Sequence, residues 1–341
     1  MYLVSSGWLL HDISSAFEEE SKKITLRGHN EEFVRLPGDF AWAKSLSVDE
    51  IASDICPVRK DLYNSKLRPD LNRKQRDGKM TWGRLAGMVV EPYCTGLLEH
   101  FDDLYNGNSK VTYQTLFEAV VSHSKEFFTQ STIRQQLNDL KSIASEEGYN
   151  SPEHLKLVLE YSARNELALL GADFVLREVG DQNRRRLTER VPIMVKKEVL
   201  KIHPKTASTG ISDPATPDFL MNKIGAVGDV KSGREFKRSH QVTCAGYALA
   251  RESELGSAGD TNFGIIYFIE THNTVPTPAR AYFFVISDAL RRAFLDRRNN
   301  AYEVLSRSML AQEPPDINPV KREEYCIHCK FVDLCDRDRT N

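Results

Sequence analysis

Two short apolar runs with a turn between them constrain the fold more than any other part of this sequence. Residues 219–221 and 226–230 are strand-like, and the turn that separates them contains Gly225. The pattern predicts an antiparallel hairpin. If Met221 pairs with Ala226, the register of the whole hairpin is fixed.

This register would place Asp218 directly opposite Asp229, where the Cβ atoms of facing residues lie about 5 Å apart. Lys231 is two residues beyond Asp229, so its side chain leaves the same face of the sheet. Two carboxylates at this separation can share one Mg or Mn ion, which polarises a phosphate and activates a bound water. The lysine would orient that water or stabilise the developing charge. The hairpin therefore predicts metal-assisted phosphodiester hydrolysis.

Asp213 is the alternative to Asp218 as the first carboxylate of the pair. It ranks second because Pro214 and Pro217 separate it from the strand, and the same register does not set it opposite Asp229. The alternative for the Asp-x-Lys tripeptide itself is a surface ion pair of little consequence.

Three of the six cysteines crowd into the last sixteen residues. Cys326, Cys329 and Cys335 form a C-x2-C-x5-C run, whose spacing allows three thiolates to converge on one metal centre. One coordination position remains for a fourth ligand. Zinc and a 4Fe-4S cluster both accept four thiolates, so the spacing does not choose between them, and His328 is a candidate ligand in the zinc alternative. Cys94 and Cys244 stand among apolar neighbours on predicted helices, and we expect them in the core.

Charge and hydropathy limit the remaining possibilities. The net charge is −2, so a nucleic-acid surface would have to be local, for example around Lys237 and Arg238. The apolar run over residues 2–10 is too short to span a bilayer and lacks a basic lead-in. We expect a soluble cytoplasmic protein.

The periodicity predicts a helical first half followed by a mixed sheet with helices, which is an α/β class. Ser47 to Glu50 has capping-box spacing and begins a short helix. Further predicted elements are helices within 80–105, 113–143, 152–179, 240–250 and 288–310, and strands over 191–202, 263–270 and 281–286.

The motif Pro217-Asp218 followed by Asp229-Val230-Lys231 resembles the core motif of the PD-(D/E)XK nucleases. Together with the cysteines it resembles the RecB-like iron-sulfur nucleases. The segments 46–63 and 82–84 are similar to their CRISPR-associated exonuclease branch, found mainly in archaea. The resemblance implies a restriction-endonuclease-like core, with a mixed central sheet flanked by helices. The implied organisation is an irregular lead-in (1–45), an N-terminal helical part (46–112), a helical insertion (113–180), a nuclease core (181–312) and an iron-sulfur tail (313–341).

The resemblance also implies site residues. Cys56, followed by Pro57, would be the fourth ligand of a 4Fe-4S cluster that joins the two ends of the nuclease domain. A helix after the hairpin would bring Gln241 and Tyr247 to the site and the DNA. Here five residues separate the two, which does not put them on one helical face. A half-buried core aromatic is the alternative for Tyr247.

One position departs from the family pattern. The early helix should carry a metal-binding histidine four residues after Gly83, but this chain has Gly87 there. Glu91 or Glu198 could complete the metal site, and the departure is the main support for a catalytically weakened protein.

The implied function is an Mg- or Mn-dependent DNA exonuclease that trims single-stranded DNA or DNA with single-stranded ends before its integration as CRISPR spacers. Its partner would be the adaptation integrase. Two alternatives stay open: a RecB-like nuclease of DNA repair or recombination, and a catalytically weakened DNA-binding or scaffold subunit. The sequence has no G-x-x-x-x-G-K-[ST] loop, so a helicase would be another chain.

Overall fold

The structure is a computed structural model of the 341-residue chain. It describes residues 2–4, 14–38, 40–54, 56–68, 88–90, 92–93, 96–97, 100, 113–147, 151–163, 201–221, 224–233, 235–270, 279–316, 331 and 335. Within these residues the chain forms a mixed α/β fold, as the sequence predicts.

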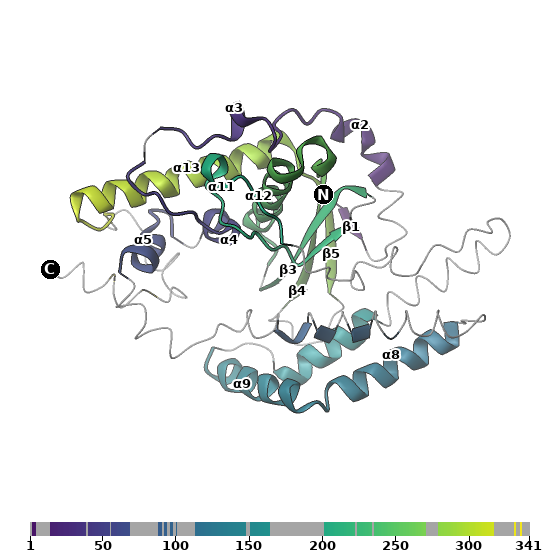
Figure 1. Cartoon of the computed structure of the whole chain (residues 1–341). Helices are drawn as coiled ribbons and strands as arrows, with labels where there is room; N and C mark the ends of the chain where they lie inside the picture. Colours follow the sequence, from purple (N-terminus) through teal and green to yellow (C-terminus); the bar gives the residue numbers. More distant parts are fainter. Residues whose placement is uncertain are drawn as a thin grey trace.

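A five-stranded sheet in the order β1-β5-β4-β3-β2 forms the centre of the fold (Figure 1). Its strands are β1 (Tyr2–Val4), β2 (Phe219–Met221), β3 (Ala226–Gly233), β4 (Phe263–Glu270) and β5 (Arg280–Val285). β3 and β4 are parallel, whereas the other neighbouring pairs are antiparallel. A parallel pair needs a long crossover connection, and α12 (Arg238–Leu255) supplies it.

The predicted hairpin register is confirmed. Met221 pairs with Ala226, so Asp218 comes directly before the first paired residue of β2, at the level of Asp229 on β3. β4 has the predicted bounds, and β3 continues three residues beyond its predicted end at Val230.

The helices are α2 (Glu18–Ser21), α3 (Glu31–Val34), α4 (Val48–Ala52), α5 (Lys60–Leu67), α8 (Tyr113–Phe127), α9 (Ser131–Glu147), α11 (Thr206–Thr209), α12, the 3-10 helix η4 (Gly256–Gly259) and α13 (Asp288–Ala311). Residues 152–163 are also helical. The Ser47–Glu50 capping box at the start of α4 is confirmed, with both reciprocal hydrogen bonds present.

The segment expected to be an irregular lead-in holds regular structure as well. Tyr2–Val4 forms strand β1, which pairs with the outer edge of β5 and so covers backbone groups that would otherwise be unpaired, and α2 and α3 follow. Strand pairing depends on a partner distant in sequence, which the weak local periodicity does not reveal.

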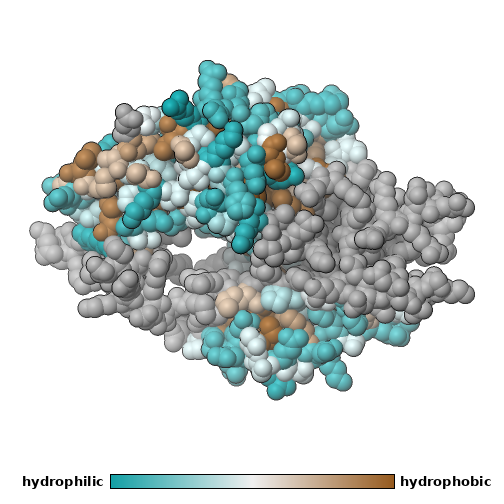
Figure 2. Space-filling model, in the orientation of Figure 1, coloured by the Kyte–Doolittle hydropathy of each residue, from teal (hydrophilic) through white to brown (hydrophobic). Residues whose placement is uncertain are grey.

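Helices cover both faces of the sheet (Figure 1). Along β4, Ile265, Tyr267 and Ile269 pack against the side that carries α8 and α9. The alternate residues, Ile266 and Phe268, pack against α12 and α13. Because successive side chains of a strand point to opposite faces, a strand buried on both sides is apolar throughout, as β4 is. Figure 2 shows hydrophilic residues over much of the viewed surface of the described residues, with smaller hydrophobic areas between them.

Gly246 allows three helices to meet at one point. A Cβ atom at this position would lie 2.3 Å from the Phe294 ring of α13 and 2.7 Å from Cγ1 of Val48 on α4. The absence of a side chain therefore lets α4 approach α12 closely.

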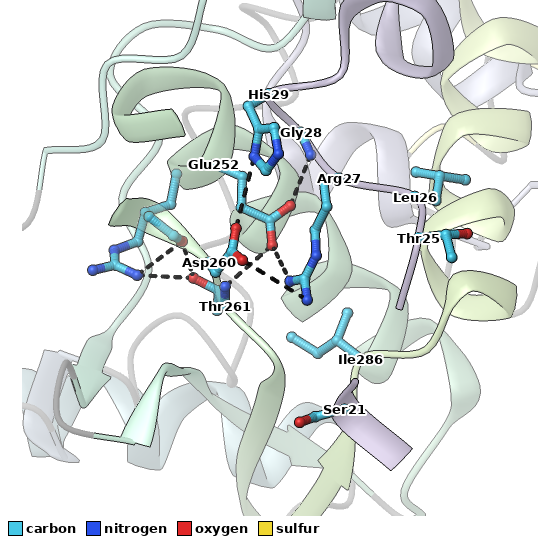
Figure 3. Close-up of polar contacts among 12 residues, drawn as sticks. Ser21, Thr25, Leu26, Arg27, Gly28, His29, Glu252, Asp260, Thr261 and Ile286 are labelled. Atoms are coloured by element: carbon cyan, nitrogen blue, oxygen red, sulfur yellow. Dashed lines mark hydrogen bonds and ion pairs between the residues drawn. The ribbon is translucent and has the colours of Figure 1, made fainter. Parts of the chain in front are cut away.

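Glu252 of α12 joins distant parts of the chain through a fully buried carboxylate (Figure 3). Arg291 donates to both of its oxygens, at 2.6 and 3.0 Å. Arg27 and the backbone N–H groups of Gly28 and Thr261 donate to it as well. A buried carboxylate is tolerated only when it is paired and hydrogen-bonded, and this one is satisfied from four directions. Although burial opposes it, the Arg291 guanidinium holds the pKa of Glu252 below its usual value.

None of the described helices has an apolar stretch long enough to cross a membrane.

Replacement of Glu252 by glutamine should destabilise the fold strongly. The change leaves the Arg291 guanidinium buried without a counter-charge, which typically costs about 3–5 kcal/mol. The measurement is the free energy of unfolding by urea. Glu303→Gln is the control, because it removes an exposed ion pair with Arg307 on α13 and should cost no more than about 0.5 kcal/mol. Equal losses of unfolding free energy in the two variants would contradict the structural role given to the Glu252–Arg291 pair.

Candidate active site

The hairpin brings Asp218 and Asp229 together, as the register predicts. Oδ2 of Asp218 accepts a hydrogen bond of 2.7 Å from the backbone N–H of Val230, which fixes this carboxylate beside β3. Asp229 is buried, whereas Asp218 is partly exposed. The pair therefore has one buried and one solvent-facing member.

The strand period decides which side of the sheet holds the site. Ala226 and Val230 pack with the cluster on the α8 and α9 side, and Val227 packs with the cluster around α12. Asp229 and Lys231 alternate in phase with Val227, so they lie on the face covered by α12 and α4.

Asp229 is held in surroundings that oppose a negative charge. Burial raises the pKa of Asp229 well above its usual value, the Lys231 ammonium group opposes this rise, and the neighbouring carboxyl of Asp218 adds to it. Its buried Oδ2 accepts no hydrogen bond of good geometry from the described residues. Such a carboxylate pair binds either a proton or a cation, because two adjacent negative charges in a buried site repel each other.

Lys231 supplies one such cation. Its Nζ atom lies 2.6 Å from Oδ2 of Asp229 and 3.0 Å from Oδ1 of Asp49 on α4. Burial favours the neutral amine, but the two carboxylates outweigh it and raise the pKa of Lys231 above its usual value. Lys231 is therefore a fixed positive charge within the site.

Asp49 is a site residue that the sequence pattern did not reveal. The capping box predicts its helix correctly, yet capping describes only the local turn. The packing of α4 on α12 brings Asp49 to Lys231 across 182 residues of sequence.

Tyr247 and Gln241 both lie on α12, as predicted. Tyr247 is buried, and its pKa is raised by burial and by the negative charges of Asp229, Asp49 and Asp218. Its phenol is thus neutral and within electrostatic reach of the carboxylates. Gln241 is partly exposed near the start of the helix. Cys244 is fully buried on the same helix, which confirms its predicted place in the core.

His240 is a second residue that sequence reasoning missed. Burial and the positive charge of Lys231 lower the pKa of His240 to about 4. The ring packs against Phe236 and Phe268, and its Nδ1 accepts a hydrogen bond from the backbone N–H of Lys237. The imidazole is therefore neutral beside the Lys231 ammonium group.

The donors at this site suit a small divalent cation. Mg²⁺ is commonly bound by one or two carboxylates, with water and substrate phosphate completing its octahedron. Asp218 and Asp229 match that donor set. Within the described ranges no group of three or more His, Cys, Asp or Glu side chains is arranged around a common metal position.

Asp213 lies outside this cluster. Its Oδ1 is 2.6 Å from Nδ1 of His203, and both side chains are about half exposed, at 49% and 54%. The structure thus supports the lower rank that the register gives to Asp213.

Two of the predicted cluster cysteines lie beside the same helix. The backbone carbonyl of Cys56 accepts from the N–H of Arg59, where α5 begins, and Sγ of Cys335 lies 3.8 Å from Nδ2 of Asn64 on α5. Neither cysteine is in a disulfide, and both are partly exposed. Cys326 and Cys329 lie outside the described residues, as do His328, Cys94, Gly87, Glu91 and Glu198.

The fold and the site define a mixed α/β protein with a carboxylate and lysine cluster on one face of its sheet. A family model described as CRISPR-associated exonuclease Csa1 matches residues 4–336, and the chain belongs to this family. The predicted relationship to CRISPR-associated exonucleases is therefore confirmed.

A curated relative, the CRISPR-associated exonuclease Csa1 of Saccharolobus solfataricus (strain ATCC 35092 / DSM 1617 / JCM 11322 / P2), is 25% identical over 118 residues. The alignment covers 35% of this chain and 36% of the relative, about a third of each protein. No solved structure matches the chain.

The low pKa of His240 predicts a pH-dependent stability. Between pH 6.5 and about 4 the folded protein keeps His240 neutral, while the unfolded chain binds a proton there. Because the unfolded state binds more protons in this window, the free energy of unfolding falls as the pH drops through it. His240→Gln should make that decline shallower, by up to about 1.4 kcal/mol for each unit of the pKa difference.

Urea unfolding of the two proteins across this pH range measures the effect. At about pH 8 neither state carries a proton on a histidine with an ordinary pKa. A difference in unfolding free energy between the two proteins at pH 8 therefore reports packing alone, and the measurement at this pH is the internal control. If the free energies of unfolding of wild type and His240→Gln change in parallel from pH 8 to 4, His240 does not control the pH dependence of stability.

Proposed function

We propose that this protein is a metal-dependent DNA exonuclease whose active centre is formed by Asp218, Asp229 and Lys231. The observation that carries the proposal is the approach of two carboxylates and an ammonium group on one face of the sheet. Membership of a family described as CRISPR-associated exonucleases supports it. We also propose that the sheet and its crossover helix are the restriction-endonuclease-like core of the PD-(D/E)XK nucleases.

Each residue has a defined task in this proposal. Asp218 and Asp229 would hold Mg²⁺ or Mn²⁺, which when bound polarises a phosphate and lowers the pKa of a water ligand. Lys231 stabilises the negative charge that develops on the phosphate oxygens. Tyr247 contributes a neutral phenol beside the carboxylates, and Gln241 would contact DNA from the start of α12.

The DNA backbone would approach from the N-terminal end of α12. Lys237 and Arg238 are exposed there, on the helix that also carries His240 toward Lys231. Basic side chains and the N–H groups at a helix N-terminus both attract phosphate. Single-stranded DNA, or DNA with single-stranded ends, is the proposed substrate.

We propose further that Cys56, Cys326, Cys329 and Cys335 hold a 4Fe-4S cluster. The nearness of Cys56 and Cys335 to α5 supports this, because the two cysteines are 279 positions apart (335 − 56) in the sequence. A cluster at this place would join the beginning and the end of the domain. Processing of DNA for CRISPR spacer acquisition, in association with adaptation integrase proteins, is the proposed biological role.

Cleavage of end-labelled single-stranded DNA with Mn²⁺ tests the active centre. Anaerobically purified wild type should cleave, whereas Asp229→Ala and Lys231→Ala should each lose at least about a hundredfold in rate, since the first removes a metal ligand and the second removes a positive charge that stabilises the transition state. Asp213→Ala is the matched control and should retain activity, because its side chain pairs with His203 outside the cluster.

If wild type with its cluster intact does not cleave, the proposed activity is wrong, and a scaffold subunit with glycine at position 87 becomes the better explanation. Loss of cleavage in Asp213→Ala alone would transfer the catalytic role to that carboxylate.

Iron content and visible absorption test the cluster. Cys335→Ala should lower both, because a 4Fe-4S cluster requires four thiolate ligands. Cys244→Ala is the matched control and should retain the iron, since Cys244 is buried in the core. Purified protein that contains zinc and no iron would overturn the iron-sulfur assignment in favour of the zinc alternative.

A further inference from the structure

We propose that Asp49 is a positioning residue that shares the Lys231 ammonium group with Asp229 and thereby leaves Asp229 able to bind a divalent cation. This inference rests on the proposed nuclease function and adds to it a residue from a different part of the chain. It concerns the placement of Lys231 and does not make Asp49 a metal ligand.

The geometry gives Lys231 two acceptors with different surroundings. Nζ lies 2.6 Å from Oδ2 of Asp229, whose side chain is 6% exposed, and 3.0 Å from Oδ1 of Asp49, whose side chain is 61% exposed. The ammonium group therefore bridges a buried carboxylate and a solvent-facing one. A small shift toward Asp49 would keep Lys231 ion-paired while it moves away from Asp229.

Such a shift matters because Lys231 and a divalent cation are attracted to the same carboxylate. At ion-pair distances two cations on one carboxylate repel each other strongly in a buried site. Without Asp49, Lys231 would have Asp229 as its nearest counter-charge and would compete fully with the metal. With Asp49 present, the ammonium group has a second anion with which it can stay paired.

Asp49 can serve in this way because α4 is fixed at both ends. The Ser47 and Glu50 capping box closes its N-terminus, so the backbone of Asp49 is held in the first turn. At the other end, Arg59 donates to the carbonyl of Ser53 at 2.6 Å and to that of Glu50, and Arg297 of α13 donates to the carbonyl of Ala52.

The packing of α4 on α12 sets the distance to Lys231. Val48, the neighbour of Asp49, occupies the space that a side chain at Gly246 would fill. A short helix that is capped, held by two arginines and packed on glycine offers a rigid support, as a positioning residue requires.

A double-mutant cycle on Mn²⁺ affinity tests the proposal, with calorimetry or electron paramagnetic resonance on the full chain. Asp49→Asn should weaken Mn²⁺ binding about two- to fivefold, the range expected for a partly exposed ion pair. Lys231→Met should tighten it, because the competing ammonium group is gone. In the Lys231→Met background, Asp49→Asn should have no further effect, since Asp49 acts through Lys231.

The alternatives predict a different cycle. If Asp49 is a metal ligand, or if it acts only through its long-range charge, Asp49→Asn weakens Mn²⁺ binding equally with and without Lys231, and the proposal is overturned. Asp139→Asn, on an exposed part of α9, controls for the change in net charge and should leave the affinity unchanged. Urea unfolding of each variant verifies that the fold is intact.

Asp229→Asn separates this inference from the function on which it rests. Mn²⁺ binding that survives Asp229→Asn shows that the metal site lies elsewhere, so the proposed active centre fails. Binding that depends on Asp229 but shows additive effects of Asp49 and Lys231 contradicts the positioning role alone.

Discussion

The buried ion pair between Glu252 and Arg291 connects the parts of the chain on which the rest of the structure depends. Its carboxylate receives hydrogen bonds from the N-terminal segment, from the residues before β4 and from α13, while it belongs to α12 itself. A carboxylate with no exposed surface must be satisfied by its surroundings, so these four segments can occupy only one arrangement. The pair sits near the C-terminal end of α12, and the opposite end of that helix carries His240 to the candidate site. One helix therefore carries the buried ion pair near one end and a neutral side chain of the candidate site at the other.

The candidate site shows the opposite electrostatic balance. Glu252 has enough donors to keep its pKa low, whereas Asp229 lies buried beside a second carboxylate and has its pKa raised. The first carboxylate is satisfied by the protein and gains nothing from a ligand. The second is stabilised by an added cation, and this difference is the physical reason why we propose a functional role for Asp229 and a structural role for Glu252. The proposed chemistry with Mg²⁺ or Mn²⁺ needs carboxylates that accept a cation, and the chain belongs to a family described as CRISPR-associated exonucleases.

Four elements build this site, and one of them, α4, is far from the other three in the sequence. The β2–β3 hairpin, with Asp218 directly before β2, contributes the carboxylates and the lysine. α12 covers them with a neutral phenol and a neutral imidazole, and α4 adds Asp49 from the N-terminal part. Gly246 is the point at which α4, α12 and α13 come close enough for this to happen. The Cys56 turn follows α4 directly, and its Arg59 binds the carbonyls at the end of that helix. The proposed metal cluster and the proposed active centre are thus linked through one short helix.

The sequence by itself determined the hairpin, its register and the identities of Asp218, Asp229 and Lys231, because strand alternation and a glycine turn are local rules that need no partner. It also determined the capping box of α4 and the bounds of β4. Only the tertiary structure decided that β1 joins the sheet, that Asp49 reaches Lys231 and that His240 is neutral. Each of these depends on which distant elements pack together, and on the burial and neighbouring charges that follow. The periodicity of the sequence reveals neither the packing of distant elements nor the burial and charges that result from it.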